Sequence, residues 1–376
     1  MDPRSPGANS RESLANFDGL RDIRNLYKDE GLQAAALGMQ FPIPYYDHRP
    51  QHLGMNGLDV MVVLIRHLYR HMVAEDREKV AEDEEENPLL RLAWCMFDKD
   101  RETAKRQDDV REDIMRWLRK EHRVHPSLAF EDLAESRIMV ETMFSKPPFL
   151  LYHPIVPCKA RADGHEWKPT RFHPKDNAAS SLVTWDGHGD LGEFISNEMF
   201  GIQNDDRGNN YYYTFDQPTF IRVQYTNVNN TKTYKDLAEI CVENKLVHED
   251  GSLIPTWDKG MDDPRDNWVR INYRLIAAVR ARDPNTPKDR DFIRRWHISG
   301  KPLLDPEESS FSSQQWKIGS GNGTYVLYYC MLPETHRRPL AAGELPEQTI
   351  RDRSLKANFD RMSSAVRNAS KEAESQ

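Results

Sequence analysis

The chain has 376 residues, of which 38% are hydrophobic, 30% charged and 10% aromatic, enough for a sizeable core in one large domain or two smaller ones. Its formal net charge of -8 excludes a basic surface over the whole molecule, so we expect no nucleic acid among its partners. It has 4 cysteines and none of them forms a CxxC pair, which excludes a cysteine-rich zinc module and argues against a disulfide framework.

The first part of the chain is predicted to be helical. Residues 1–16 are rich in Pro, Ser and charge and are interpreted as a disordered leader. Residues 14–39 carry apolar side chains at helical spacing, in a helix that we expect to end near Gly31. The helix predicted for residues 51–72 is apolar around most of its circumference, so we expect it to run through the middle of a core.

The polar residues in and after this central helix have local explanations. Asn56 or Asp59 can cap the free amides of its first turn. His67 and His71 are one turn apart and could hold a metal, but a solvated helix face is the simpler interpretation because no third ligand is near in the sequence. The acidic run 75–87 is interpreted as a solvated helix end or loop, with a docking site for a basic partner as the alternative.

Helical spacing continues in residues 88–100, 108–122 and 130–144, so we predict that residues 17–145 form a mainly helical part. The composition then changes, because β-branched and aromatic runs separated by turn residues occupy residues 146–332, which we predict to be β-rich.

Four strands are predicted from their patterns, at residues 219–226, 268–282, 291–299 and 324–332, and residues 232–246 are expected to form a short helix. Helices first and sheet second predict an α+β fold with mainly antiparallel pairing.

Residues 333–376 are interpreted as a polar, largely disordered tail. The chain starts without the apolar run of a signal peptide, and no apolar run is long enough to cross a membrane. We therefore expect an intracellular protein, cytoplasmic or nuclear, without a membrane partner.

Several of these segments resemble the ubiquitin-specific protease family. The family's first box, Gly-Asn-Thr-Cys before an apolar helix, is similar to HLGMNGLDVMVVLIRHL, in which Asn56-Gly57-Leu58 stands where Asn-Thr-Cys would be. The second box, a Tyr-x-Leu-x-Ala-Val strand followed after a loop by Gly-His-Tyr, is similar to residues 273–279 and then Arg290-Asp291-Phe292. Residues 324–329 resemble the closing strand, and 219–226 the strand before the palm.

The resemblance spans roughly residues 36–332 and implies a papain-like cysteine protease fold, with a helical thumb facing an antiparallel β-rich palm. All departures from the family fall on its chemistry. Leu58 is in the nucleophile position beside Asn56, Asp291 is in the histidine position, and the paired CxxC ligands of the family's zinc-binding fingers are missing. The resemblance therefore implies a degenerate member that has lost the protease dyad.

Other residues are candidates to replace the missing dyad. Cys158 stands beside Lys159 and Arg161, a cationic setting that lowers a thiol pKa, and His165 follows it in the sequence. His297 is a further candidate base, although an ordinary strand histidine is the simpler interpretation. The remaining cysteines lie in apolar segments and are interpreted as buried structural thiols: Cys95, Cys241 and Cys330.

Asp186, His188 and Asp190 alternate with glycines and offer potential metal ligands. A Gly-Asp-rich turn explains this loop equally well, so we predict no metal and no cofactor.

These observations leave three hypotheses for function. The first is a non-catalytic domain, similar to ubiquitin-specific proteases, that binds ubiquitin or a ubiquitin-like protein or scaffolds a complex of other proteins. The second is an active cysteine-type deubiquitinase whose catalytic residues lie elsewhere in the chain. The third is an intracellular interaction or assembly protein of unrelated fold.

Overall fold

The computed structural model describes residues 15–42, 53–98, 100–159, 167–228, 232–245, 268–286, 289–303, 311–313 and 315–333. Residues 1–14 of the predicted leader and 334–376 of the predicted tail lie outside the described residues, as does His165. Ala15 is already packed in the helical core. None of the described helices is long and apolar enough to cross a membrane.

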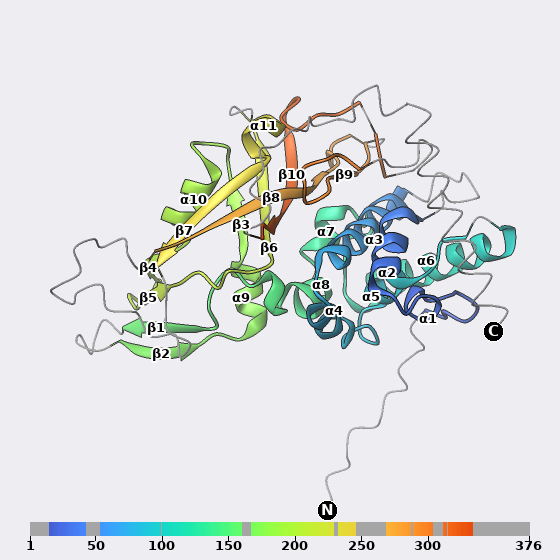
Figure 1. Cartoon of the computed structure of the whole chain (residues 1–376), viewed down its shortest axis with the longest axis horizontal. Helices are drawn as coiled ribbons and strands as arrows, with labels where there is room; N and C mark the ends of the chain where they lie inside the picture. The colour runs from blue at the N-terminus through green and yellow to red at the C-terminus, as the bar shows by residue number, and fades with distance from the viewer. Residues whose placement is uncertain are drawn as a thin grey trace, which may run out of the picture.

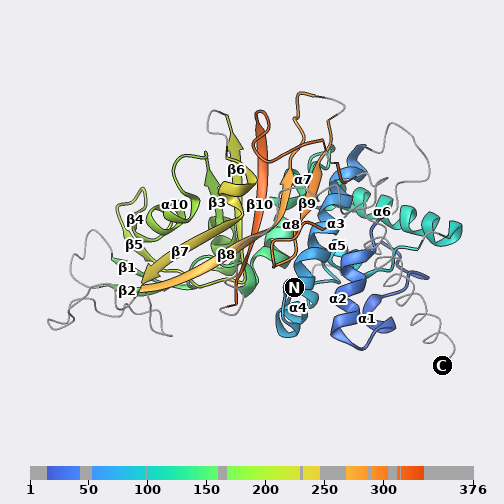
Figure 2. The same ribbon diagram turned by 45° about the horizontal axis from the view of Figure 1, so that its top comes forward.

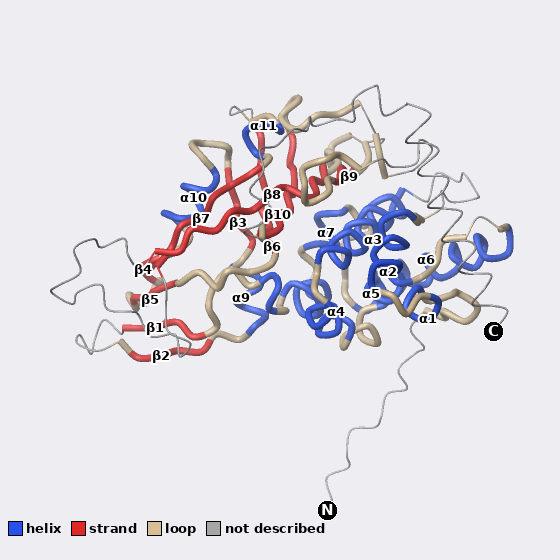
Figure 3. The backbone as a smooth tube through the Cα atoms, in the orientation of Figure 1, coloured by secondary structure: helices blue, strands red, loops and turns tan. Residues whose placement is uncertain are grey.

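The helices gather in one half of the molecule and most of the strands in the other (Figures 1 and 3). We call these halves the helical lobe, residues 15–149, and the β lobe, residues 150–333. The helical lobe contains α1 (Ile23–Leu26), α2 (Glu30–Met39), α3 (Leu53–His71), α4 (Ala74–Ala81), α5 (Pro88–Trp94), α6 (Arg101–Glu121), α7 (Phe130–Ala134), α8 (Arg137–Met139), the π-helical turn Val140–Phe144 and the 3-10 turn Pro147–Phe149.

The central helix α3 is where the sequence predicts it. Its residues from Leu58 to Ile65 are fully or almost fully buried, because α2, α5, α6 and α7 surround it and β8 and β9 cover its remaining side. The prediction that Asn56 or Asp59 caps this helix is wrong. The helix begins earlier, at Leu53, so both side chains lie inside it and bond to distant segments instead.

The predicted stop at Gly31 is also wrong. The chain forms two helices here, and Gly31 lies inside the second of them, α2. The break between the two helices lies before Asp29. The Asp29 side chain accepts a hydrogen bond from the Leu32 N–H at 2.9 Å and caps α2. An N-cap carboxylate can begin a new helix even two residues before a glycine.

The β lobe contains two sheets. The strands are β1 (Ile155–Lys159), β2 (Lys168–Arg171), β3 (Leu182–Trp185), β4 (Gly201–Asn204), β5 (Asn210–Tyr213), β6 (Phe220–Asn227), β7 (Glu239–Lys245), β8 (Trp268–Arg280), β9 (Phe292–Arg295) and β10 (Gly323–Met331), with helices α9 (Pro174–Ser180), α10 (Leu191–Glu198) and α11 (Tyr234–Leu237) between them. The large sheet has the order β3-β6-β10-β8-β7, with β9 also paired to β8, and the small sheet has the order β2-β1-β5-β4.

All pairs are antiparallel except β3 with β6, which is parallel. The predicted α+β class with mainly antiparallel pairing is therefore confirmed. Residues 232–246 are a correction: only α11 is helical there, and Cys241 lies in β7, because its segment pairs with β8 along its whole length.

The large sheet is buried on both faces, which explains why β10 is apolar at successive positions. Val326, Tyr328 and Cys330 pack into the core of the helical lobe, whereas Leu327 and Tyr329 pack into a second core on the opposite face. In the turned view of Figure 2, β9 and β10 lie close to α3 and α7. The sheet therefore rests directly on the helical lobe, and the seam between the two passes the start of α3.

Candidate functional site

The start of α3 meets the start of β9 at a buried seam. The Asn56 side-chain amide donates to the Asp291 carbonyl oxygen at 3.1 Å, and its oxygen accepts from the Asp291 N–H at 2.8 Å. The two residues are 235 positions apart. The segments that the resemblance assigns to nucleophile and base are thus adjacent in space, as a thumb facing a palm requires.

The Asp291 side chain is fully buried and holds three segments together. One carboxylate oxygen accepts from the Phe130 N–H at 3.1 Å, and the other accepts from the Arg282 N–H at 3.0 Å. The Arg282 guanidinium lies 3.6 Å from the carboxylate and donates to the Ser127 carbonyl oxygen at 2.8 Å. Burial raises the pKa of Asp291, an effect that these donors partly offset.

Gly57 allows the loop before α7 to close over the seam. A Cβ atom at this position would lie 2.1 Å from the Leu128 carbonyl oxygen and 3.0 Å from the Phe130 nitrogen. Leu128 itself has a positive φ of 49° and is fully buried. The backbone of this loop therefore packs directly on the first turns of α3.

Leu58 and Asp59 also take structural roles. Leu58 is fully buried in the hydrophobic core. The Asp59 carboxylate accepts from the Arg111 guanidinium at 2.9 Å, and Arg111 also pairs with Asp108 on its own helix, α6. These buried carboxylates raise the pKa of Arg111 against the lowering effect of burial. The ion pair between Asp59 and Arg111 holds α6 against α3.

This arrangement lacks the parts that acyl transfer requires. No sulfur or hydroxyl stands at residue 58, and both oxygens of Asp291 accept backbone hydrogen bonds, so the carboxylate is not available as a base. Through the resemblance, the sequence indicated that the segments of Leu58 and Asp291 meet, but not that Asn56 bonds to Asp291. It gave no signal for Arg282, Arg111 or the backbone of Phe130.

The cysteines do not restore a catalytic pair among the described residues. Burial raises the pKa of Cys95 and of Cys330 to about 12 and raises that of Cys241 less. Cys158 is half-buried in β1 of the small sheet, opposite Tyr211 of β5. Cys95, Cys241 and Cys330 are therefore poor nucleophiles. Cys158 lies in the small sheet, away from the seam.

His297 follows β9 in the large sheet, and its Nδ1 lies 2.9 Å from the Ser299 hydroxyl. Its ring centroid is 6.5 Å from that of His71, at the end of α3 opposite the Asp291 seam. The structure therefore does not bring His297 and Cys158 together, since they belong to different sheets.

The interpretation of His67 and His71 as a solvated helix face is wrong. His67 is fully buried and His71 is half-buried, because β8 covers this side of α3. The Nε2 of His67 lies 2.9 Å from the Ile276 carbonyl oxygen. Burial lowers the pKa of His67 far below its usual value and that of His71 to about 3, and the nearby Arg70 lowers both further.

The loop with Asp186, His188 and Asp190 is a turn between β3 and α10. Asp186 accepts from the His188 N–H at 3.0 Å, and Asp190 caps α10 by accepting from the Glu193 N–H at 3.0 Å. Both Asp186 and His188 are exposed. In the described part of the chain no cluster of three or more His, Cys, Asp or Glu has the arrangement of a metal site.

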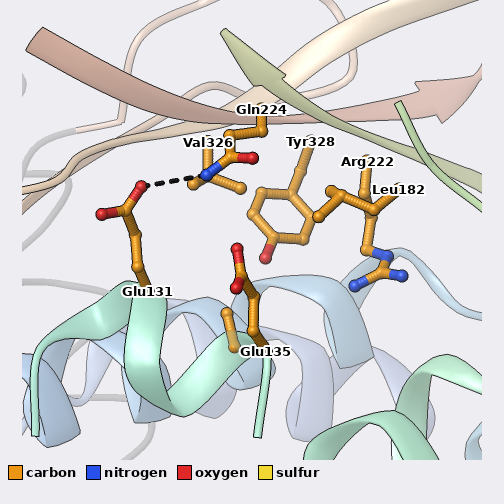
Figure 4. Close-up of a pocket in the computed structure, with 8 residues that line it drawn as sticks. Glu131, Glu135, Leu182, Arg222, Gln224, Val326 and Tyr328 are labelled. Atoms are coloured by element: carbon orange, nitrogen blue, oxygen red, sulfur yellow. Dashed lines mark hydrogen bonds between the residues drawn. The ribbon is translucent and has the colours of Figure 1, made fainter. Parts of the chain in front are cut away.

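A shallow pocket lies beside the seam, between α7 and the large sheet (Figure 4). Glu131 and Glu135 rise into it from the helical lobe, and Glu131 accepts from the Gln224 amide at 3.2 Å. The buried Tyr328 hydroxyl points into the pocket and has no hydrogen-bond partner among the described residues. Burial raises the pKa values of Glu131 and Tyr328 and lowers that of Arg222, which also lines the pocket, to about 10.

No family model matches this chain, and no curated protein matches it. Among solved structures, it is similar to a chain of the SAGA Ubp8/Sgf11/Sus1/Sgf73 DUB module bound to ubiquitin aldehyde, with a TM-score of 0.38, 9% identity, and coverage of 80% of this chain and 70% of that one. It is also similar to the Saccharomyces cerevisiae PAN2 pseudoubiquitin-hydrolase, with a TM-score of 0.37, 9% identity, and coverage of 81% and 90%.

A third similar structure is a Saccharomyces cerevisiae Pan2 pseudoubiquitin hydrolase-RNA exonuclease module in complex with AAUUAA RNA, with a TM-score of 0.27, 9% identity and coverage of 90% of this chain but 58% of that one. These likenesses agree with the resemblance to ubiquitin-specific proteases. Because their TM-scores are below 0.5, they carry no argument about activity or partners. The expectation that nucleic acid is not a partner therefore stays untested.

Proposed function

We propose that this chain is a non-catalytic domain of ubiquitin-specific-protease-like architecture, which binds a ubiquitin-like protein or scaffolds a complex. The observation that carries the proposal is the reciprocal hydrogen bonding of Asn56 with Asp291. These hydrogen bonds join the two segments that would carry the catalytic dyad in a protease of this family. In this chain, the two segments hold the lobes together. According to this proposal, the chain has lost catalytic activity and has kept the two-lobe scaffold.

The surface proposed for binding lies along the pocket between α7 and the large sheet. It adjoins the closed seam directly, because Phe130 donates to Asp291 and the next residue, Glu131, lines the pocket. Two carboxylates and one guanidinium give this lining a net negative charge, which suits a partner segment that carries cations.

The alternative docking site, the acidic run 75–87, is used in part inside the molecule. Glu84 binds the Arg24 guanidinium through both oxygens, at 2.7 and 2.8 Å. Asp83 lies 2.7 Å from the Lys146 ammonium. These ion pairs join α1 and the end of the helical lobe to the segment after α4. The involvement of these carboxylates in internal pairs favours the pocket over the acidic run as the partner surface.

Ubiquitin with a C-terminal electrophile, added to the full chain, tests the proposal. We expect no covalent adduct, and we expect binding of unmodified ubiquitin that is detectable by calorimetry. The substitution Glu135→Lys, at an exposed residue that lines the pocket, should weaken this binding about tenfold or more, since it reverses a charge at the proposed contact.

Glu85→Lys is the matched control, because Glu85 is exposed in the acidic run and away from the pocket. It should leave ubiquitin binding unchanged. A covalent adduct that disappears in Cys158→Ala would overturn the proposal in favour of an active cysteine hydrolase. The absence of both adduct and binding would remove ubiquitin as the partner and favour the assembly-protein hypothesis.

A further inference from the structure

The small sheet ends in two edge strands that differ in their protection. At one edge, β2 carries Lys168, Pro169 and Arg171, and charges and proline are the residues that prevent an edge from pairing with another strand. At the other edge, β4 reads Gly-Ile-Gln-Asn, without charge or proline, and pairs only with β5 among the described strands. This edge is open to an added strand.

At one edge of the large sheet, strand β7 is covered by a helix. The helix α10 packs against β7, and the Glu243 N–H of β7 donates to the Ser196 hydroxyl of α10 at 2.9 Å. Gly192 permits this contact, since a Cβ there would lie 2.3 Å from the Cys241 carbonyl oxygen. No described element packs against β4 in this way, since among the described strands and helices β4 has close contacts with β5 above all.

The hydrogen-bond pattern shows which backbone groups of β4 are free. The Asp205 N–H donates to the Asn209 carbonyl oxygen at 3.0 Å, just beyond the last pair of the ladder. Because bonded and non-bonded pairs alternate in an antiparallel ladder, Gln203 bonds toward β5, while the backbone groups of Ile202 and Asn204 point away from it. Both residues are exposed, Ile202 by 60%.

The surroundings of β4 define the chemistry of what would bind. Ile202 lies opposite Tyr212, whose ring is 6.4 Å from that of Trp167, so an apolar strip crosses this face of the sheet. The exposed carboxylates of Glu198 and Asp206 stand before and after the strand. An apolar centre between two acidic ends is complementary to an extended segment with an apolar centre and basic ends.

A second copy of this chain is the less favourable occupant. A second copy would bring a second set of the same flanking carboxylates, Glu198 and Asp206, to this edge. Like charges that are brought close together repel each other and weaken association. The charges therefore favour a different, basic polypeptide.

We propose that the free edge of β4 is a docking site for an extended, basic polypeptide segment, which adds to the small sheet as a further strand. Its backbone bonds to Ile202 and Asn204, its apolar side chains cover the Ile202 and Tyr212 strip, and its cations face Glu198 and Asp206. A strand of this length makes few hydrogen bonds, so we expect binding in the micromolar range or weaker. This site is separate from the pocket proposed for ubiquitin.

The probe is a fluorescent peptide, Lys-Thr-Val-Thr-Val-Thr-Lys, titrated with the full chain and followed by anisotropy. We expect Asn204→Pro to weaken binding about tenfold or more, because proline removes the outward N–H of an edge strand and is tolerated there. Asn204→Ala keeps that N–H and should change the affinity less than about twofold. The same peptide with Glu in place of both Lys should bind more weakly.

Equal binding of the basic peptide by the wild type and Asn204→Pro, or no binding by either, would overturn the proposal. Tighter binding of the acidic peptide would do the same. Self-association that Asn204→Pro abolishes would assign the edge to a second copy and also overturn it. Ubiquitin binding should be unchanged in Asn204→Pro, so the two proposals fail independently.

Discussion

At the scale of single residues, Asn56 pairs with both backbone groups of Asp291 in a seam closed to solvent. A side-chain amide suits this task, because it offers one donor and one acceptor side by side. Removing the partner of a buried polar group costs more free energy than an average hydrogen bond contributes, because no water molecule can replace that partner. The stability of the seam therefore depends strongly on this one residue.

We expect Asn56→Ala to lower the free energy of unfolding by about 2–4 kcal/mol, because the N–H and C=O of Asp291 would both lose their partner. Urea denaturation at neutral pH measures this change. Asn25→Ala is the matched control, since Asn25 is exposed on α1, and it should stay within about 0.5 kcal/mol of the wild type. A similar small effect for Asn56→Ala would contradict the role given to the seam.

At the scale of elements, α3 is held by neighbours that contact its backbone as well as its side chains. The loop before α7 touches α3 at Gly57, and the buried Asp59 and Arg111 pair joins it to α6. Helices usually pack through side chains, so a backbone contact requires a residue without a Cβ. The requirement for glycine at residue 57 thus comes from the contact with the loop before α7, not from the geometry of helix α3.

We expect Gly57→Ala to destabilise the protein by about 2 kcal/mol or more, because the added Cβ meets the rigid backbone carbonyl of Leu128 at 2.1 Å. Thermal unfolding followed by circular dichroism measures the effect.

Gly38→Ala on α2 is the matched control for this prediction. A Cβ there would meet only the flexible end of Arg70, at 2.8 Å from its Nη1. The gain in helix propensity should leave this variant neutral or up to about 1 kcal/mol more stable. Equal losses in both variants would mean that the contact with Leu128 does not decide the cost.

At the scale of the whole molecule, the lobes are joined at both ends of α3. Asn56 bonds to Asp291 at its start, and His67 bonds to the Ile276 carbonyl oxygen nearer its end. His67 and His71 are kept neutral by burial and by nearby Arg70, since both have lowered pKa values. Protonation of either ring would place a charge inside the contact between the lobes.

The lowered pKa values predict a loss of stability in mild acid. The unfolded chain binds a proton at each of these histidines near pH 6.5, while the folded chain does not until a much lower pH. Stability is therefore retained above pH 6.5 and should fall below it, by about 1.4 kcal/mol per pH unit for each histidine. Asp216, whose pKa burial raises to about 6, acts in the opposite sense.

Urea denaturation of His67→Gln from pH 7 to pH 5 isolates this contribution from that of Asp216. The variant should be less stable than the wild type at pH 7 and lose less stability on acidification. His188→Gln, at an exposed loop residue, should follow the wild-type curve. Parallel curves for His67→Gln and the wild type would show that His67 does not carry the pH dependence.

Much of the secondary structure could be predicted from local patterns. The central helix and the strands β6, β8 and β10 are where the periodicity of apolar residues places them, because burial on one or two faces imposes a period that a short window contains. Helix α2 and strand β7 were missed. The first begins at a capping carboxylate, and the second pairs with β8, a contact that its own residues do not encode.

The sequence by itself determined the identity of the side chains at the seam: no thiol at residue 58, no histidine at residue 291, and a glycine between Asn56 and Leu58. Only the tertiary structure decided what they do instead. The bonds from Asp291 to Asn56, Phe130 and Arg282 join segments that are distant along the chain or separated by a loop. Local periodicity carries no information about such contacts, since they form only when the sheet packs on the helical lobe and excludes water.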